Sequence, residues 1–256
     1  MKLSISNARL GAALTVLSLV SMFGTAKATL VEGFESGSFN GSESSIGDTG
    51  ITTSFFGINA TEGTHQMLMT TINNGHDAPQ THVFSDAVAN SSIDSFFGLA
   101  STQPRDGAAV SFEGSGFSIN LGTLTAGTTI SFDYDFLTNE IQPGAHNDFA
   151  YYLQVGSSTV NVLADTNSAF LHPTTGAGDP FALETGYHTL TINVLSTGPY
   201  TLGLGVSDAS TTDTSSGLLI DNIQVISPVP EPTTIAFSVA GAALLVALRR
   251  RIKRTS

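Results

Sequence analysis

The sequence predicts an all-β fold: an antiparallel jelly-roll or β-sandwich ectodomain at residues 29–226, with a signal peptide before it and one transmembrane helix after it. Three observations support this. Short runs of alternating apolar and polar residues are separated by Gly, Asn, Asp, Ser and Pro. Helical periodicity is almost missing from the middle of the chain. An apolar stretch next to basic residues lies at each end.

The clearest strand is 128–136, where Ile130, Phe132, Tyr134 and Phe136 alternate with polar side chains. The other expected strands are 66–70, 108–112, 117–121, 149–155, 159–163, 188–194, 200–206 and 218–226. A short helix is expected over 92–97, ended by Gly98. The polar stretches 36–63 and 73–106 are expected to be loops. No linker interrupts residues 29–226, so we predict one domain.

Composition excludes several classes of protein. Without cysteine there is no disulfide framework, thiol nucleophile or Cys-ligated zinc. Residues 29–228 contain twenty carboxylates, one basic side chain (Arg105) and no lysine, a net charge of −19. Such a surface excludes general nucleic-acid binding, because phosphate contacts need basic side chains. We expect the domain to leave its carboxylates in water, spread them apart or bind cations.

Residues 1–28 have the layout of a secretory signal peptide. Lys2 and Arg9 give a positive start, and an apolar run covers 10–20. Ala26 and Ala28 flank Lys27 in the small-x-small pattern that signal peptidase recognises. The alternative, a buried N-terminal helix, lacks a capping residue and a polar face. We therefore predict a mature protein that starts at Thr29.

The C-terminal segment has three parts. A stalk at 227–232 contains the motif Val229, Pro230, Glu231, Pro232; an apolar stretch covers 233–248; and a basic tail covers 249–256. The apolar stretch would be about 24 Å long as a helix, and flanking side chains that snorkel complete a membrane span. The basic tail keeps the C-terminus cytoplasmic and places the preceding chain outside.

This tail resembles the PEP-CTERM sorting signal of Gram-negative bacteria, in its Pro230-Glu231-Pro232, its short span and its Arg-rich end. The resemblance implies that an exosortase, an integral-membrane transpeptidase-like enzyme, processes the protein near this motif. It also implies export, at least transient membrane anchoring, and delivery to the cell surface or the biofilm matrix. The alternative is an ordinary membrane anchor at the end of the chain.

Asp221 is the most informative residue of the last expected strand. A period of two puts it on one face with Leu219, Ile223 and Val225. A buried carboxylate must be neutralised or find a partner. With one arginine and no lysine in the domain, a bound cation is the natural partner. Oxygen ligands in an acidic domain favour Ca²⁺ over zinc.

The domain also resembles the carbohydrate-binding jelly rolls attached to glycoside hydrolases. The motifs that carry this resemblance are Gly33-Phe34-Glu35-Ser36-Gly37, Glu62-Gly63 and Ile220-Asp221-Asn222-Ile223. The resemblance implies a structural Ca²⁺ between the first and last strands, with Glu35 and Asp221 as ligands and Glu62 as a third. The chain departs from the family in having no tryptophan to stack on sugars. Phe39, Phe55 and Phe56 occupy the region, where packing is the simpler role.

A second set of carboxylates comprises Asp133, Asp135, Glu140 and Asp148. If the strands around 128–136 and 149–155 form a hairpin, these side chains approach one another and form a second cation site. The alternative is a solvated acidic face, which we favour because acidic residues on the polar side of a strand are usually in water.

These observations lead to three hypotheses. The first is an exported, exosortase-processed, noncatalytic protein of the cell surface or matrix, whose calcium-stabilised sandwich associates with exopolysaccharide. The second is a structural or adhesive module that self-associates through strand edges or calcium bridges. The third is a polysaccharide-processing hydrolase that uses carboxylates such as Asp133 and Glu140. The lack of a Gly-x-Ser-x-Gly elbow and of a paired-His motif disfavours catalysis.

Overall fold

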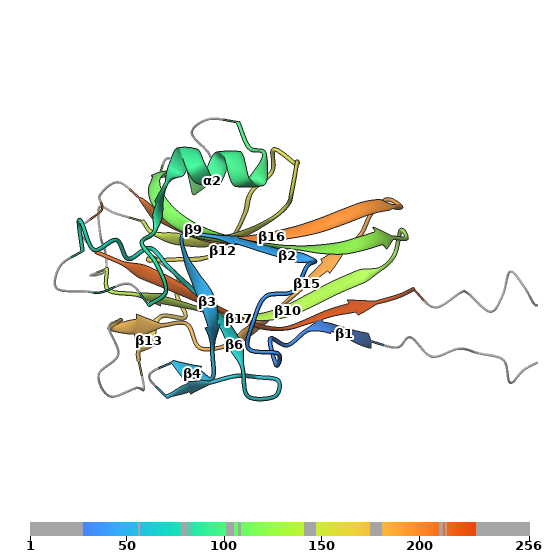
Figure 1. Cartoon of the computed structure of the whole chain (residues 1–256), viewed down its shortest axis with the longest axis horizontal. Helices are drawn as coiled ribbons and strands as arrows, with labels where there is room; N and C mark the ends of the chain where they lie inside the picture. Colours follow the sequence, from blue (N-terminus) through green and yellow to red (C-terminus); the bar gives the residue numbers. More distant parts are fainter. Residues whose placement is uncertain are drawn as a thin grey trace, which may run out of the picture. The chain divides into compact units, whose positions relative to one another are not determined.

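Two antiparallel sheets lie face to face in the part of the chain that the structure, a computed structural model, describes (Figure 1). The described residues are 28–55, 57–77, 81, 83–100, 105–106, 109–140, 147–174, 181–209, 212 and 214–228. All but Pro228 belong to the compact unit Ala28–Ser227. The predicted all-β sandwich is therefore confirmed.

Several predictions concern residues outside the described part of the chain. These are the signal segment up to Lys27, with Ala26, and the motif Val229–Pro232, the membrane span 233–248 and the basic tail 249–256. Ala28, the other residue of the expected cleavage site, is the first residue of β1 (Ala28–Glu32). No helix of the described residues has the length and apolar character to cross a membrane.

The first sheet has the strand order β13-β14-β10-β17-β6-β3, with β15 also pairing with β10, and β1 with β17. The central strand β17 pairs antiparallel with both β10 and β6. Besides β1, the strands are β3 (Asp48–Thr52), β6 (Gln66–Thr70), β10 (Thr129–Thr138), β13 (His172–Pro173), β14 (Leu183–Glu184), β15 (His188–Asn193) and β17 (Ser216–Ile226).

The second sheet has the order β12-β11-β16-β9-β2, and two short strands, β7 and β8, also pair with β9. Its strands are β2 (Glu43–Ile46), β7 (Val88–Ala89), β8 (Arg105–Asp106), β9 (Ala109–Leu124), β11 (Phe149–Gln154), β12 (Asn161–Asp165) and β16 (Gly198–Ala209). A separate hairpin joins β4 (Ser54–Phe55) to β5 (Ile58–Asn59).

The main core lies between the two sheets. The alternation predicted for 128–136 is confirmed, because Ile130, Phe132 and Phe136 of β10 are fully buried in it. Facing them from the second sheet are apolar side chains such as Leu204 of β16. Smaller apolar clusters cover the outer faces. One is built around Phe55 and Phe181, and the other around Phe97.

The single described α-helix, α2 (Asn90–Phe97), lies over the outer face of the second sheet (Figure 1). The helix was predicted over 92–97 and begins two residues earlier. It ends as predicted at Gly98, which has left-handed backbone angles and donates its N–H to the last turn. Phe97 is seated over Gly116 of β9 and Gly203 of β16, where an added Cβ would lie 2.9 Å from the ring.

Three expectations about the strands were wrong. The stretch 36–63 is not a loop, because it contains β2, β3, β4 and β5. The stretch 73–106 contains the short strands β7 and β8. The strands expected at 108–112 and 117–121 form one strand, β9. Gly114 and Gly116, which lie between the two expected strands, face Ser207 and Gly205 of the paired strand β16. An added Cβ at Gly114 would lie 2.3 Å from the carbonyl oxygen of Val206, so this close backbone approach requires glycine.

A β-bulge at Asn222 interrupts β17. The register with β10 shifts by one residue between Ser131 and Asp133. Asn222 has a φ of 55°, in the left-handed region that non-glycine residues rarely adopt. Because a bulge adds one residue to one strand, it reverses which side chains face the core beyond that point.

The bulge overturns the prediction that Leu219, Asp221, Ile223 and Val225 share one face. Leu219 belongs to the outer cluster around Phe55, whereas Ile223 is buried in the main core. Asp221 therefore lies on the outer face of the first sheet with Leu219. A strict period of two could not show this, because the phase changes at Asn222.

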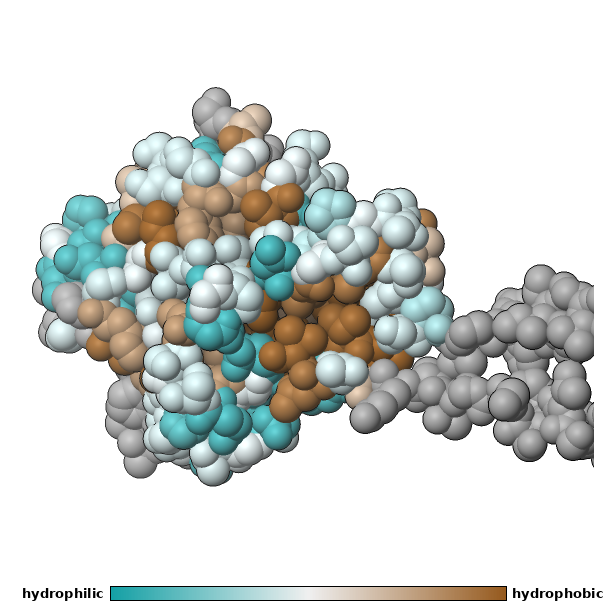
Figure 2. Space-filling view, turned by 45° about the vertical axis from the view of Figure 1, so that its right-hand side comes forward, coloured by the Kyte–Doolittle hydropathy of each residue, from teal (hydrophilic) through white to brown (hydrophobic). Residues whose placement is uncertain are grey.

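Apolar and hydrophilic side chains share the molecular surface. The face in Figure 2 shows apolar areas set between hydrophilic ones. Among the described residues, the large apolar side chains that are exposed come from several parts of the chain: Leu30, Val31, Val83, Phe84, Phe112, Val162, Phe170 and Leu195. Leu195, in the connection between β15 and β16, has the highest exposed fraction of these, 91%.

Candidate functional site

Asp221 is completely buried beneath the loop that follows β5. Its Oδ2 accepts hydrogen bonds from the backbone N–H of Thr61 and of Glu62, each at 2.7 Å, and from the Thr61 hydroxyl at 3.1 Å. Its Oδ1 accepts the N–H of Asn222 at 2.7 Å. Burial raises the pKa of Asp221, and these bonds to the ionised form oppose that rise. Asp221 therefore holds the 61–62 loop against β17.

Glu35 holds the next part of the same loop. Its Oε1 accepts the backbone N–H of Thr64 at 2.8 Å and of His65 at 2.7 Å. These backbone bonds lower the pKa of Glu35. Glu62 instead points toward Gly33, where an added Cβ would lie 2.3 Å from Glu62 Oε2. That oxygen is buried and accepts no hydrogen bond within the described residues.

The structure thus brings Glu35, Glu62 and Asp221 to one loop, 61–65, but to different parts of it. The oxygens of Glu35 and Asp221 are occupied by N–H and hydroxyl donors. These three residues are not among the described acidic side chains whose ligand atoms converge within 4.8 Å of one another. The calcium ion expected at Glu35, Glu62 and Asp221 stays a prediction.

Asp133 and Asp135 lie on the outer face of β10, and the expectation of a solvated acidic face there is wrong. Their exposed fractions are 7% and 1%, and Thr61 of the 61–65 loop packs against Asp133. Asp133 accepts hydrogen bonds from the hydroxyl of Thr61 at 2.8 Å and of Thr189 at 2.5 Å. Asp135 accepts one from the Thr185 hydroxyl at 3.1 Å. Burial, reinforced by the nearby Glu184 carboxylate, raises the pKa of Asp135 to about 7.

Glu140 and Asp148, the other two members of the second predicted set, are also buried. Asp148 accepts the backbone N–H of Ala209 at 3.0 Å and the Ser216 hydroxyl at 2.7 Å, so it ties β16 to β17 across the sandwich. Burial raises the pKa of Asp148, and the Glu140 carboxylate adds to the rise. The hairpin expected between 128–136 and 149–155 does not form, because β10 and β11 belong to different sheets. The set therefore divides: Asp135 lies near Glu184, and Asp148 near Glu140 and Asp208.

A third group of carboxylates was missed from the sequence. Asp77, Glu113 and Asp208 are 3%, 4% and 0% exposed, and their ligand oxygens lie within 4.8 Å of one another. Glu113 and Asp208 are register partners on β9 and β16, and Asp77 comes from the turn after β6. Burial raises the pKa of Asp208, as do the neighbouring carboxylates of Asp148, Glu113 and Asp77.

One signal for this group was present in the sequence. Leu202, Leu204, Val206 and Asp208 alternate along β16, and the three apolar members are buried in the main core. Asp208 is therefore a carboxylate in an apolar row of its strand, which is the same sequence signal that marked Asp221. No comparable signal marks Asp77, which lies in a polar turn between strands.

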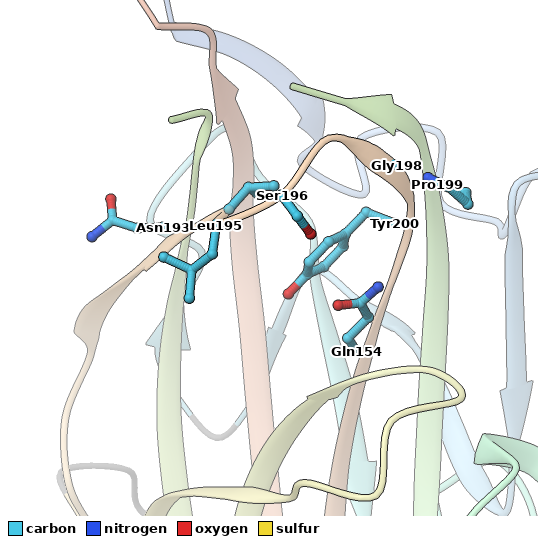
Figure 3. Close-up of a pocket in the computed structure, with 8 residues that line it drawn as sticks. Gln154, Asn193, Leu195, Ser196, Gly198, Pro199 and Tyr200 are labelled. Atoms are coloured by element: carbon cyan, nitrogen blue, oxygen red, sulfur yellow. The ribbon is translucent and has the colours of Figure 1, made fainter. Parts of the chain in front are cut away.

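A pocket of about 570 Å³ lies at the opposite end of β16 from Asp208. Its lining residues are Gln154, Asn193, Val194, Leu195, Ser196, Gly198, Pro199 and Tyr200. In Figure 3 the ring of Tyr200 lies at the centre, with the Ser196 side chain above it and the Gln154 amide below the ring, beside its hydroxyl. Asn193 points away from this group.

The pocket has a neutral lining in a strongly acidic domain. None of its eight lining residues is charged, and four of them carry an amide or hydroxyl group in the side chain: Gln154, Asn193, Ser196 and Tyr200. Its volume falls within the range of small-molecule sites, roughly 300–1,000 Å³. The neutral hydrogen-bonding side chains suit an uncharged, hydroxyl-rich ligand, while the Tyr200 ring beside them is 9% exposed and packs in the main core.

No protein-family model matches the sequence, and no curated protein matches it. Solved structures that this chain resembles include TmCBM61 in complex with β-1,4-galactotriose, at 12% identity and a TM-score of 0.36, covering 77% of this chain and 94% of the other. A second is the K3 cleaved adhesin domain of Lys-gingipain from Porphyromonas gingivalis W83, at 14% identity and a TM-score of 0.40, covering 79% and 100%. A third is CBM28, specific for non-crystalline cellulose, at 11% identity and a TM-score of 0.37, covering 80% and 98%. At these TM-scores the likeness carries no conclusion about what this chain binds.

Proposed function

We propose that this protein is a noncatalytic β-sandwich module that associates with neutral extracellular polysaccharide, and that the pocket around Tyr200 is where it does so. The observation that carries the proposal is the chemistry of the lining. The hydroxyl groups of a sugar would hydrogen-bond to the side chains of Gln154 and Ser196, whereas the Tyr200 ring, 9% exposed and packed in the main core, lines the pocket with only a small exposed area.

The charge of the domain narrows the ligand class. With a net charge of −19 over residues 29–228, the domain repels polyanions at long range. A neutral polysaccharide meets no such repulsion, and the uncharged pocket offers nothing that would pair with uronate or sulfate groups. The proposal is therefore restricted to uncharged sugars.

A noncatalytic role agrees with the same geometry. Glycoside hydrolysis needs a pair of carboxylates on either side of the scissile bond, about 5–10 Å apart. No carboxylate lines the pocket. Asp133, a candidate for hydrolysis in the sequence, is 7% exposed and its oxygens accept hydrogen bonds from Thr61 and Thr189. Such a carboxylate is a structural acceptor with no access to a polymer.

The terminal segments indicate where in the cell the module acts. The signal-like residues 1–28 and the PEP-CTERM-like residues 229–256 support export and processing by signal peptidase and an exosortase. We therefore place the module at the cell surface or in the extracellular matrix of a Gram-negative bacterium, after transient anchoring by the C-terminal span. Treatment of whole cells with an external protease, with and without exosortase, tests this location.

Affinity electrophoresis of the full-length protein tests the binding. Gels that contain galactan, xylan or a soluble glucan serve as neutral probes, and an alginate gel serves as the anionic probe. We expect retardation by at least one neutral polymer and none by alginate. The variants Gln154→Ala and Ser196→Ala each remove one hydrogen-bonding group, so we expect roughly threefold to tenfold weaker binding.

Asn59→Ala is the matched control, because Asn59 is an exposed polar residue of β5 outside the pocket lining. Its binding should equal that of the unmodified protein. Migration that none of the neutral polymers changes would overturn the proposal. If Asn59→Ala and the pocket variants lose binding to the same extent, the pocket is not the binding site.

A further inference from the structure

Three buried carboxylates face one another between the two sheets, at the end of the sandwich opposite the Tyr200 pocket. Asp208 of β16 and Glu113 of β9 are direct register partners, and Asp77 joins them from the turn after β6. Like charges directly opposite on paired strands destabilise a sheet. The domain nevertheless places these side chains where their exposed fractions are 4% or less.

Asp208 differs from other buried carboxylates of this domain. Asp48 and Asp221 are equally buried, but their oxygens accept hydrogen bonds from backbone N–H groups of loops. Asp208 is fully buried, and neither of its carboxylate oxygens accepts a hydrogen bond from an N–H or hydroxyl group of the described residues; the polar group within its hydrogen-bonding reach is the Asp148 carboxyl, a second acid. Oε1 of Glu113 is also buried and accepts no hydrogen bond within the described residues. Buried oxygens without donors cost several kcal/mol per ionised group unless a ligand satisfies them.

Among the side chains that the structure describes, those around the group supply little positive charge. His76 is the basic side chain placed beside the group, with its Nδ1 3.5 Å from Glu113 Oε2, and about half of that side chain is exposed. The next buried group, Asp148, is another carboxylate whose charge acts on Asp208. Residues 29–228 contain no lysine. What these carboxylates require is a cation or protons.

We propose that Asp77, Glu113 and Asp208 hold a divalent cation between the sheets, and that the ion is Ca²⁺. All ligand atoms of this site are carboxylate oxygens, which are hard ligands that suit Ca²⁺ and not zinc. Two oxygens bound to one Ca²⁺ at 2.3–2.6 Å lie within about 5 Å of each other, as the ligand atoms of this group do. The ion would link β9, β16 and the turn after β6.

This site is separate from the one expected at Glu35, Glu62 and Asp221. Asp221 lies on the outer face of the first sheet beneath Thr61, whereas Asp208 follows the inward-facing row of Leu202, Leu204 and Val206. The proposal therefore predicts that Ca²⁺ binding is weakened in Asp208→Asn and unchanged in Asp221→Asn, whereas an ion at Asp221 would give the opposite result. The proposal is also independent of polysaccharide binding, because the pocket lies at the other end of β16.

Calorimetric titration of chelator-treated full-length protein with CaCl₂ at pH 8 tests the proposal. We expect Ca²⁺ binding by the unmodified protein, at least roughly tenfold weaker binding by Asp208→Asn and by Glu113→Gln, and unchanged binding by Asp221→Asn. The melting temperature should rise with Ca²⁺ in the unmodified protein and much less in Asp208→Asn.

The folded state of the variant is itself part of the test. An amide in place of a buried carboxylate removes a charge from the group, so Asp208→Asn should melt in chelator at least as high as the unmodified protein. The proposal is overturned if Ca²⁺ at millimolar concentration produces neither heat nor a shift in melting temperature. It is also overturned if Asp208→Asn binds Ca²⁺ normally, if this variant fails to fold in chelator, or if binding is lost in Asp221→Asn instead.

Discussion

Backbone N–H groups are the partners of several buried carboxylates in this domain. Asp48 shows the arrangement most clearly: it is fully buried and accepts the N–H groups of Val83, Phe84 and Ser85 at 3.0, 2.6 and 3.0 Å. Asp221 does the same for Thr61 and Glu62. Hydrogen bonds to an ionised acceptor are about twice as strong as those between neutral groups, so a loop can stabilise a buried charge without a basic residue.

This arrangement explains why reasoning from charge alone was incomplete. The sequence left three outcomes for an acidic domain with one arginine: solvated carboxylates, separated carboxylates or bound cations. Burial against backbone donors is a fourth, and residue types do not reveal it because every residue except proline carries an N–H group. Asp221 was correctly identified as unusual, but its hydrogen-bond partners could be found only from the folded loop.

At the residue scale, Asp221→Ala should destabilise the domain in the presence of chelator. The substitution leaves the N–H groups of Thr61 and Glu62 without their acceptor and removes the contact between that loop and β17. We expect a loss of about 2–3 kcal/mol in the free energy of unfolding, measured by urea denaturation.

Asp86→Ala is the control for this measurement. Asp86 also accepts a backbone N–H, that of Asn74 at 2.9 Å, but it lies in an exposed segment where water replaces the carboxylate. Its cost should stay below about 1 kcal/mol. Equal losses in the two variants would show that burial of Asp221 adds nothing to its role.

At the scale of elements, the sequence predicted long regular strands better than short ones. Strand 128–136 was found because its alternation is local and unbroken, and the helix end at Gly98 because a glycine with left-handed angles is a local signal. The strands within 43–59 are two to five residues long, too short for a period to stand out. The bulge at Asn222 depends on how β17 pairs with β10, which is not a property of either segment alone.

The packing of α2 gives a prediction at this scale. Phe97 is fully buried on a surface made by glycines, and a Cβ at position 203 would lie 2.9 Å from its ring and 3.1 Å from Leu153. Gly203→Ala must therefore displace the ring or the helix, and overpacking of this kind costs about 1–3 kcal/mol. Urea denaturation measures the loss.

Gly41→Ala is the matched substitution, because no atom lies within 4 Å of a Cβ added at Gly41. It should leave the free energy of unfolding within about 0.5 kcal/mol of the unmodified value. If Gly203→Ala is equally neutral, the helix does not pack on the sheet as the structure has it.

At the scale of the whole molecule, the sandwich separates two chemical environments. The buried carboxylates Asp77, Glu113 and Asp208 lie at one end of β16, and the neutral pocket around Tyr200 lies at the other. The sequence indicated an acidic domain with a divalent ion, but it placed that ion by motif resemblance at Glu35 and Asp221. The convergence of Asp77 with Glu113 and Asp208 depends on three segments far apart in the chain, so it could not be predicted from spacing.

Buried carboxylates give the molecule an unusual dependence on pH. Burial raises the pKa of Glu43 and of Asp135 to about 7, and it also raises the pKa values of Glu113, Asp148 and Asp208. In the unfolded chain these groups ionise near pH 4. Between pH 4 and 7 the folded state therefore holds more protons than the unfolded state, and stability falls as the pH rises through this range.

The most direct test of this account is the free energy of unfolding in chelator, measured by urea denaturation from pH 5 to pH 8. We predict a decrease on the order of a few kcal/mol across this range, and a smaller decrease in Asp135→Asn, which lacks one of the titrating groups. A free energy of unfolding that rises from pH 5 to pH 8 would mean that the groups with raised pKa values, Glu43, Glu113, Asp135, Asp148 and Asp208, are ionised in the folded protein, and it would contradict the account.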